Sequence, residues 1–384
     1  MILSVIIPTK NRYSTLLKVV DTILAYDLNN HIEVVIQDNS NNNEEILSYL
    51  EDNKEYSNLK YFYCDEKLSV IENSDKAVLN SSGEFVCFIG DDDIVLPNII
   101  EIVQWMKKSN YGIAKCYKPE YYWPGQRCNV LSNNATGVLK FDIKAKKENS
   151  IKVLSCELGI LKTLKVGGVT MDYLPCLYHG IVNRNILNII FDKSGTFFPG
   201  PSPDMANGTA LACITSEYVF FSDPFVISGK SVNSTGGAGV IHKHVNRIEE
   251  VSHLPSNTAA NWSSGIPKYW TGPTIWAESF LKSLEFMSRE DLLGQVNYQY
   301  LYAYLTVYNY QSIDVIYKDF RFKKDVTFSY FVCTLFLRRA FNFFKNRLKL
   351  NSIEKSGLTD ISEAVLCLKN DKVFVNNYDF KVVY

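Results

Sequence analysis

Three consecutive aspartates, Asp91, Asp92 and Asp93, follow the apolar stretch Phe85–Ile89 and Gly90. Adjacent carboxylates repel each other and lose hydration when buried, so a positive partner must stabilise them. Their oxygen atoms suit Mg²⁺ or Mn²⁺, which also bind phosphate groups. Because alternate residues leaving a strand point the same way, we expect Asp91 and Asp93 to share a ligand. The alternative is a solvated turn that caps a helix opening at Pro97.

The first hundred residues alternate between two patterns. Apolar, β-branched runs predict strands, and apolar residues three or four apart predict helices. This alternation predicts a parallel sheet with helices on both faces. The expected strands are Leu3–Pro8, His31–Gln37, Leu59–Cys64 and 84–90, and the expected helices are Tyr13–Leu24 with Ser14 as N-cap, 43–53, Ser69–Ser82 and a helix from Pro97.

Polar clusters follow three of these strands: "TKNR" after the first, "QDNS" after the second and "GDDD" after the fourth. In parallel sheets, ligands bind in the crevice at the carboxyl ends of the strands. The topology therefore predicts that Thr9–Arg12, Asp38 and Asp91–Asp93 lie in one crevice.

The pattern is weaker after about residue 112. Residues 140–165 are lysine-rich and predict a helix, and Tyr218–Gly229 predicts one strand. A Pro/Gly loop in Gly195–Thr215 leads into a helix. The chain is mostly helical from about 275 to 350, with a short strand pair expected at the end.

Composition excludes several classes of protein. The 384 residues carry a net charge of −1, so no overall positive field favours nucleic acid. The nine cysteines include no CxxC pair, which indicates reduced thiols and a cytoplasmic protein. The N-terminal run is not expected to be a signal peptide, and no apolar stretch approaches the roughly 20 residues of a membrane span.

Several motifs occur together in a familiar order. "SVIIPTKNR", then "VVIQDNS", then "ENSDKAVLNSSGEFVCFIGDDDIVLPN" resemble the nucleotide-binding half of family 2 glycosyltransferases of the bacterial surface-polysaccharide type. The resemblance covers about residues 1–110, and Pro199–Ala212 is similar to a Ser-Pro-Asp segment of bacterial members. It implies the α/β GT-A (Rossmann-like) fold, a mostly parallel sheet flanked by helices, followed by a mainly helical C-terminal region. The expected divisions are 1–112 for the nucleotide sugar, 113–245 for the acceptor and 246–384 for the helical region.

The resemblance also implies roles for individual residues. Asp38 matches the acid that contacts the nucleobase, Asp91 lies near the ribose, and Asp93 binds a divalent metal (Mn²⁺ or Mg²⁺) together with Asp91. A late histidine, His242, is a candidate to complete the metal shell. The full set of expected donor-binding residues is Pro8, Thr9, Asn11, Arg12, Asp38, Asn73, Asp91 and Asp92. One departure is Glu72, which stands where the family often has an arginine, and this puts a diphosphate contact there in doubt.

Asp204 lies about where inverting members of the family keep their general base. It stands at a predicted helix start, so a helix cap is the simpler alternative. Glu217 and Asp223 are rival candidates. His179, in "CLYHGIV", is expected to be a core or cleft residue. The aromatic cluster Tyr117, Tyr121, Tyr122 and Trp123 could stack on sugars or pack in the core.

The segment Phe328–Leu350 combines large apolar residues with five basic ones. This pattern is typical of a helix that binds an anionic membrane surface, and equally of a core or dimerising helix.

These observations predict a metal-dependent, inverting transfer of a sugar from a nucleotide diphosphate, most simply UDP, to a hydroxyl of a glycan or lipid-linked glycan in surface-polysaccharide (O-antigen or capsule) synthesis. The protein would be cytoplasmic, peripheral on the inner face of the plasma membrane, and able to form a homo-oligomer. The alternatives are a sugar nucleotidyltransferase, although "PTKNRYS" lacks the expected glycine-rich loop, and a non-catalytic sugar-binding module.

Overall fold

The apolar run that opens the chain forms β1 (Leu3–Thr9) in a computed structural model. β1 lies between β2 (Ile32–Asp38) and β4 (Phe85–Phe88) and runs parallel to both. The structure describes residues 1–26, 31–127, 135–142, 150–232, 234, 246–318, 325–347, 352–371, 373 and 381–383.

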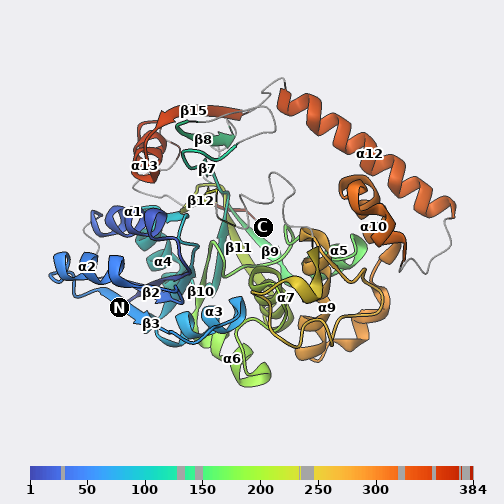
Figure 1. The fold of residues 1–384 in the computed structure, drawn as a ribbon, viewed down its shortest axis with the longest axis horizontal. Helices are drawn as coiled ribbons and strands as arrows, with labels where there is room; N and C mark the ends of the chain where they lie inside the picture. The colour runs from blue at the N-terminus through green and yellow to red at the C-terminus, as the bar shows by residue number, and fades with distance from the viewer. Residues whose placement is uncertain are drawn as a thin grey trace.

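The central sheet has nine strands within the described residues, of which β9, β10 and β16 run opposite to the other six. Figure 1 shows it running through the middle of the molecule. Its order is β16 (Lys381–Val383), β9 (Ser150–Ser155), β11 (Glu217–Phe221), β6 (Ile113–Cys116), β10 (Gly180–Asn183), β4, β1, β2 and β3 (Leu59–Tyr63).

Helices cover both faces of this sheet, because its central strands are apolar on both sides. Val5 and Ile7 face one core, while Ile6 between them faces the other. The first core is covered by α1 (Tyr13–Leu24), α4 (Ile99–Lys108) and α13 (Ile361–Asn370), and the second by α3 (Val70–Leu79), α5 (Cys156–Lys165), α6 (Arg184–Ser194) and α7 (Pro203–Ile214). α2 (Glu44–Asp52) connects β2 to β3.

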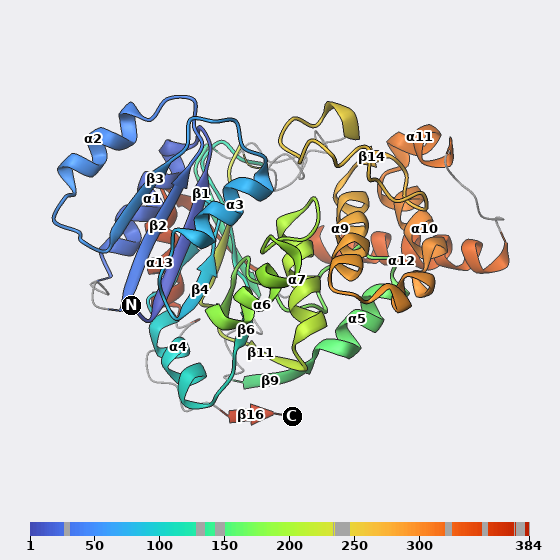
Figure 2. The ribbon, with the colours of Figure 1, turned by 90° about the horizontal axis from the view of Figure 1, so that it is seen from below.

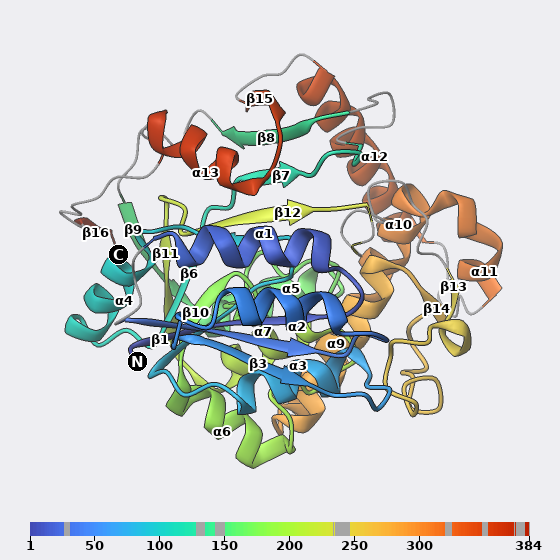
Figure 3. The same cartoon turned by 60° about the vertical axis from the view of Figure 1, so that its left-hand side comes forward.

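A second, five-stranded sheet lies next to α1 in Figure 3. Its β5 directly follows the aspartates, so this sheet helps to position them. The C-terminal part of the chain returns here, since β15 pairs with β8 and α13 packs on α1. The order is β15 (Ser352–Leu358), β8 (Gly137–Asp142), β7 (Glu120–Tyr122), β12 (Val226–Lys230) and β5 (Ile94–Val95).

The helical region that follows residue 246 packs beside α7 (Figure 2). Among the described residues, no helix is both long enough and apolar enough to cross a bilayer. The elements are β13 (Asn246–Arg247), η2 (Ile248–Glu250), β14 (Tyr269–Trp270), α9 (Gly272–Phe286), η3 (Glu290–Gln295), α10 (Tyr298–Tyr308), η4 (Tyr310–Ser312), α11 (Ile313–Lys318) and α12 (Val326–Arg347).

The expected fold class, a mostly parallel sheet flanked by helices and then a helical region, is confirmed. Several local predictions are wrong. Residues 140–165 contain β8, β9 and α5 instead of one helix, and the strand expected at Tyr218–Gly229 is two strands in different sheets. The final strands β15 and β16 also belong to different sheets. Ser14 lies inside α1, and Pro97 precedes α4 by two residues.

Candidate active site

The three aspartates lie in a turn that joins β4 to β5. The backbone N–H of Asp93 donates to the carbonyl of Gly90 at 3.2 Å, which closes the turn. Strand alternation, on which the expectation that Asp91 and Asp93 share one ligand was based, does not apply to a turn, so that expectation stays a prediction. All three side chains are buried, and each meets a different set of partners.

Asp91 is held by the loop that follows β1. Nη2 and Nε of Arg12 lie 2.6 and 3.0 Å from its two carboxylate oxygens, and the hydroxyl of Thr9 donates at 2.6 Å. Burial raises the pKa of Asp91 to about 7, although Arg12 acts in the opposite direction. The positive partner that the aspartates require is thus, in the first place, Arg12.

Asp92 is held by the segment that follows β12. Both the backbone N–H and the hydroxyl of Ser231 donate to its Oδ2, at 2.9 and 2.7 Å. Trp123 donates its indole N–H to the Asp92 carbonyl at 2.9 Å. That carbonyl lies so close to Gly229 that a Cβ there would come within 1.6 Å of it. Only glycine therefore fits at position 229.

Asp93 is enclosed by donors from two other segments. His179 Nε2 and the Tyr178 hydroxyl lie 2.6 and 3.0 Å from its Oδ2. The backbone N–H groups of Gly90 and Gly229 donate to Oδ2 and Oδ1, each at 2.7 Å. Burial raises the pKa of Asp93, but His179 and these hydrogen bonds outweigh it and hold the pKa below its usual value.

Lys118 determines the protonation state of His179. Its Nζ lies 3.2 Å from Nδ1 of the imidazole. A lysine ammonium can only donate, so Nδ1 must be the acceptor and Nε2 carries the proton that is donated to Asp93. Burial, together with the charge of Lys118, lowers the pKa of His179. The pair is therefore a neutral imidazole and an ionised carboxylate.

This arrangement leaves little space for a divalent cation on Oδ2 of Asp93. Three donors, from His179, Tyr178 and Gly90, already share Oδ2, while Oδ1 accepts from Gly229. Among the described residues, no three His, Cys, Asp or Glu side chains are grouped so as to hold a metal ion. The candidate ligand His242 lies outside the described residues.

Two residues of the site have left-handed backbone conformations. Asn11 has φ 58° and His179 has φ 63°, and neither is glycine. Such conformations are costly for ordinary residues and persist only where the surroundings impose them. At Asn11, hydrogen bonds from its own N–H to the Ser40 hydroxyl and from Asn41 N–H to its side chain hold the loop after β1 against the loop after β2.

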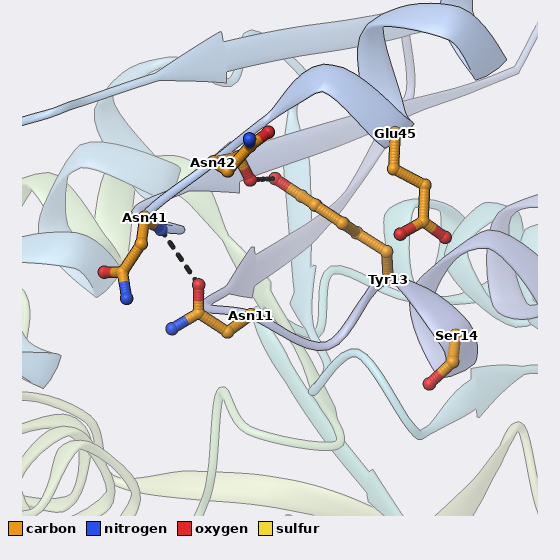
Figure 4. Close-up of a pocket in the computed structure, with 6 residues that line it drawn as sticks. All are labelled: Asn11, Tyr13, Ser14, Asn41, Asn42 and Glu45. Atoms are coloured by element: carbon orange, nitrogen blue, oxygen red, sulfur yellow. Dashed lines mark hydrogen bonds between the residues drawn. The ribbon is translucent and has the colours of Figure 1, made fainter.

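Asp38 is fully buried at the end of β2. The hydroxyls of Tyr13 and Tyr61 donate to its Oδ2 at 2.6 and 2.9 Å, and the Ser40 N–H donates to Oδ1 at 2.8 Å. Tyr13 also lines a polar pocket of about 380 Å³, shown in Figure 4. The other residues that line it are Asn11, Ser14, Asn41, Asn42 and Glu45.

The remaining donor-binding predictions lie near this crevice. Pro8 pairs with Gln37 within the sheet, and the Asn73 amide donates to the Thr9 carbonyl at 3.4 Å. Oδ1 of Asn73 is buried without a hydrogen-bond partner. Glu72, the departure from the family pattern, forms a capping box with Ser69 at the start of α3. Its role at this position is therefore structural.

Asp204 lies in the first turn of α7 and is half-buried. Its Oδ1 accepts from the Ser202 hydroxyl and from the N–H of Met205. α7 packs closely against the segment before β10. A Cβ added at Gly208 would lie only 2.6 Å from the Pro175 carbonyl. Burial raises the pKa of Cys176, and the charge of Asp204 adds to this. α7 and the aspartate turn thus both contact the segment from Pro175 to Tyr178.

The rivals of Asp204 are placed differently. Glu217 is exposed at the start of β11, and Asp223 is buried between β11 and β12, where burial raises its pKa to about 6.

Asp75 anchors the loop that leads to Asp204. It accepts from the Thr196 hydroxyl and the Phe197 N–H at 2.7 and 2.8 Å. Burial raises the pKa of Asp75 to about 6. Between about pH 4 and 6 the folded protein therefore keeps a proton on Asp75 that the unfolded chain has released. The free energy of unfolding falls as the pH rises through this range. We expect the free energy of unfolding of Asp75→Asn, relative to that of the wild type, to rise by about 1–2 kcal/mol between pH 4 and pH 8. Urea denaturation at both pH values measures this, and an unchanged difference would contradict it.

Four contacts of the site were not predicted from the sequence: those of Lys118, Tyr178, Gly229 and Ser231. His179 was expected in the core or the cleft, and it is a buried partner of Asp93. The aromatic cluster is mainly core, since Tyr121, Tyr122 and Trp123 are buried. Among the described cysteines all are free thiols, as expected.

The comparisons with known proteins include a family match to the first part of the chain. Residues 4–160 match the family described as "Glycosyl transferase family 2". A relative from Campylobacter jejuni, "GalNAc(5)-diNAcBac-PP-undecaprenol beta-1,3-glucosyltransferase", is 32% identical over 117 residues. The match covers 30% of this chain and 37% of that relative, little more than a third of its length.

Among solved structures, S. aureus TarS 1–349 in complex with UDP-GlcNAc has a TM-score of 0.47 at 14% identity, covering 84% of this chain and 90% of that one. The mannosyltransferase PcManGT from Pyrobaculum calidifontis, in complex with GDP-Man and Mn²⁺, has a TM-score of 0.41 at 15% identity, covering 91% and 87%. These two structures are distant. The sequence match is the firmer result, and it makes residues 4–160 of this chain similar to glycosyl transferase family 2.

Proposed function

We propose that this protein transfers a sugar from a nucleotide diphosphate, UDP in the first instance, to a hydroxyl of a glycan or lipid-linked glycan. The observation that carries the proposal is the crevice at the ends of β1, β2 and β4. There Arg12, Asp38 and Asp91 lie within the segment that matches family 2. The same match favours sugar transfer over nucleotidyl transfer and over a non-catalytic module.

The nucleotide is proposed to bind along the loop after β1. Tyr13 donates a hydrogen bond to Asp38 and also lines the pocket of Figure 4. This supports a position for the nucleobase close to Asp38 and that pocket. Arg12 keeps about a quarter of its side chain exposed while it pairs with Asp91. A guanidinium in this position can also bind a phosphate group. The diphosphate is therefore proposed to lie beside Arg12.

In the proposed reaction, Asp204 accepts the proton of the acceptor hydroxyl. The acceptor oxygen bonds to the anomeric carbon while the bond from that carbon to the phosphate oxygen breaks, and the nucleoside diphosphate leaves with the electron pair. Attack from the face opposite the leaving group inverts the anomeric centre. A base must lie within hydrogen-bond reach of that hydroxyl, and the half-buried position of Asp204 at a helix start supports this role.

Metal dependence stays a prediction. Mn²⁺ or Mg²⁺ would stabilise the charge of the leaving diphosphate. As described above, however, three donors already share Oδ2 of Asp93, so no step proposed here runs through a cation. A cation that binds Oδ2 would have to replace one of these donors.

The surface-polysaccharide setting and a homo-oligomer also remain proposals. We further propose that the protein is peripheral on the inner face of the plasma membrane, with contact made by the segment Phe328–Leu350. A lipid-linked acceptor would lie at that surface.

The test is a screen of nucleotide sugars for binding and slow hydrolysis, with Mn²⁺, with Mg²⁺ and with EDTA. We expect one UDP-sugar to bind and be hydrolysed. Asp93→Ala should abolish turnover while the surface variant Asp65→Ala retains it, with melting temperatures recorded to detect misfolding. If no nucleotide sugar binds under any condition, the proposed function is wrong. Turnover that is unaffected by EDTA would remove only the metal prediction.

A further inference from the structure

α12 has two different faces. One packs on α10 through Phe328, Phe331 and Leu335, which recur at three- and four-residue steps. Arg339 belongs to this inner side, since it donates to the Val307 carbonyl and its guanidinium lies 5.5 Å from the Tyr308 ring centre. Tertiary packing of α12 is therefore accounted for by this inner face.

The opposite side of α12 is also apolar. Leu337, Phe341 and Phe344 are four and three residues apart, so they lie in one row along the helix. Figure 1 shows α12 at the edge of the molecule, beside α10 and away from the central sheet. We call the following set the outward face, and its members are each 61–68% exposed: Tyr330, Leu337, Phe341 and Phe344.

An exposed apolar surface of this kind indicates a binding partner. The charge of the helix narrows the choice of partner. α12 contains Arg338, Arg339, Lys345 and Arg347 and no acidic residue. Arg338 and Lys345 are two turns apart, on the flank between the outward face and α10, where Arg338 also contacts Tyr300 of α10. Large apolar side chains next to basic ones suit the boundary between acyl chains and anionic headgroups.

We propose that the outward face of α12 docks on an anionic lipid bilayer, with the helix axis parallel to the surface. The aromatic rings and Leu337 enter the headgroup boundary, while Arg338 and Lys345 meet lipid phosphates. This rests on the membrane association proposed above and names the face and the lipid chemistry that carry it. It also narrows the contact proposed for Phe328–Leu350 to one face of α12, because Phe328 is buried.

The experiment is co-sedimentation of the full chain with vesicles of phosphatidylcholine alone and of phosphatidylcholine with about a third phosphatidylglycerol. We expect stronger binding to the anionic vesicles. Leu337→Ser/Phe341→Ser/Phe344→Ser should lower that binding more than about tenfold, because each side chain removes apolar area from the lipid contact. Arg338→Gln/Lys345→Gln should lower it about fivefold per charge, on anionic vesicles only.

The matched control is Leu79→Ser/Ile189→Ser/Leu366→Ser, which removes three exposed apolar side chains from α3, α6 and α13. It should bind vesicles like the wild type. Equal binding by wild type and the outward-face variant would overturn the proposal. So would a dimer in sedimentation velocity that the outward-face variant dissociates, since that face would then join two copies. Hydrolysis of nucleotide sugar in solution is measured on the wild type and the same variants. If none of them hydrolyses a nucleotide sugar, that result counts against the transferase proposal and not against membrane docking.

Discussion

Replacing Asp204 by asparagine is expected to lower kcat for sugar transfer about a thousandfold while leaving donor affinity nearly unchanged. A positioned general base contributes roughly 10²–10⁴ in rate, and an amide cannot accept the proton. The asparagine keeps an oxygen that can accept from the Ser202 hydroxyl and the Met205 N–H, so α7 should still begin correctly. The measurement is kcat and KM with the donor identified by the screen, together with calorimetric titration of the free nucleotide.

Glu217→Gln is the matched control, because it removes a rival carboxylate from the exposed start of β11. It should turn over like the wild type. If Asp204→Asn keeps its full rate, Asp204 is a helix cap and nothing more. If Asp223→Asn loses the rate instead, the base lies between β11 and β12, and the proposed direction of attack must be revised.

The convergence of the polar clusters could be predicted because it depends on local patterns and on topology. Apolar runs such as Leu3–Ile7 form strands that are buried on both faces, and their parallel pairing brings Thr9, Asp38 and Asp91 to one edge. Each of these residues directly follows or ends a strand that is visible in the sequence. No long-range information was needed for this part of the site.

The partners of Asp92 and Asp93 could not be predicted in the same way. His179 and Ser231 are 86 and 139 residues away from these aspartates along the chain. Their approach depends on the antiparallel insertion of β10 beside β4 and on the pairing of β12 with β5. Hydrophobic periodicity carries no information about which distant strands become neighbours. The one local signal in the sequence was that a glycine, Gly180, follows His179. The structure shows why glycine is needed there, since a Cβ on Gly180 would lie 1.8 Å from the Cys176 carbonyl.

The wrong helix at 140–165 has a different cause. Its lysine content favoured a solvated helix, whereas Ile151 and Val153 alternate with polar residues as in a strand. Similarly, β15 pairs with β8 across more than 200 residues, so its place in the second sheet could not be read from the last part of the chain.

Replacing Arg12 by methionine is expected to lower the free energy of unfolding by about 1–2 kcal/mol at pH 8, because Asp91 is then left buried without its cation. The loss should shrink as the pH falls. Burial already raises the pKa of Asp91 to about 7, and without Arg12 the pKa rises further. Protonation of Asp91 then removes the uncompensated charge, so the difference from wild type should be small near pH 5. Urea denaturation at the two pH values measures both effects.

The double variant Arg12→Met/Asp91→Asn separates charge from packing, since it removes both members of the pair. It should recover most of the lost stability at pH 8 and show little of the pH dependence. Glu51→Gln breaks the exposed ion pair with Lys54, in which both side chains are 75% exposed, and should cost less than about 1 kcal/mol. If Arg12→Met costs no more than this surface control, Arg12 does not stabilise the aspartate turn. The three adjacent carboxylates would then require another cation, and a metal ion at this turn would become the simplest explanation for their burial.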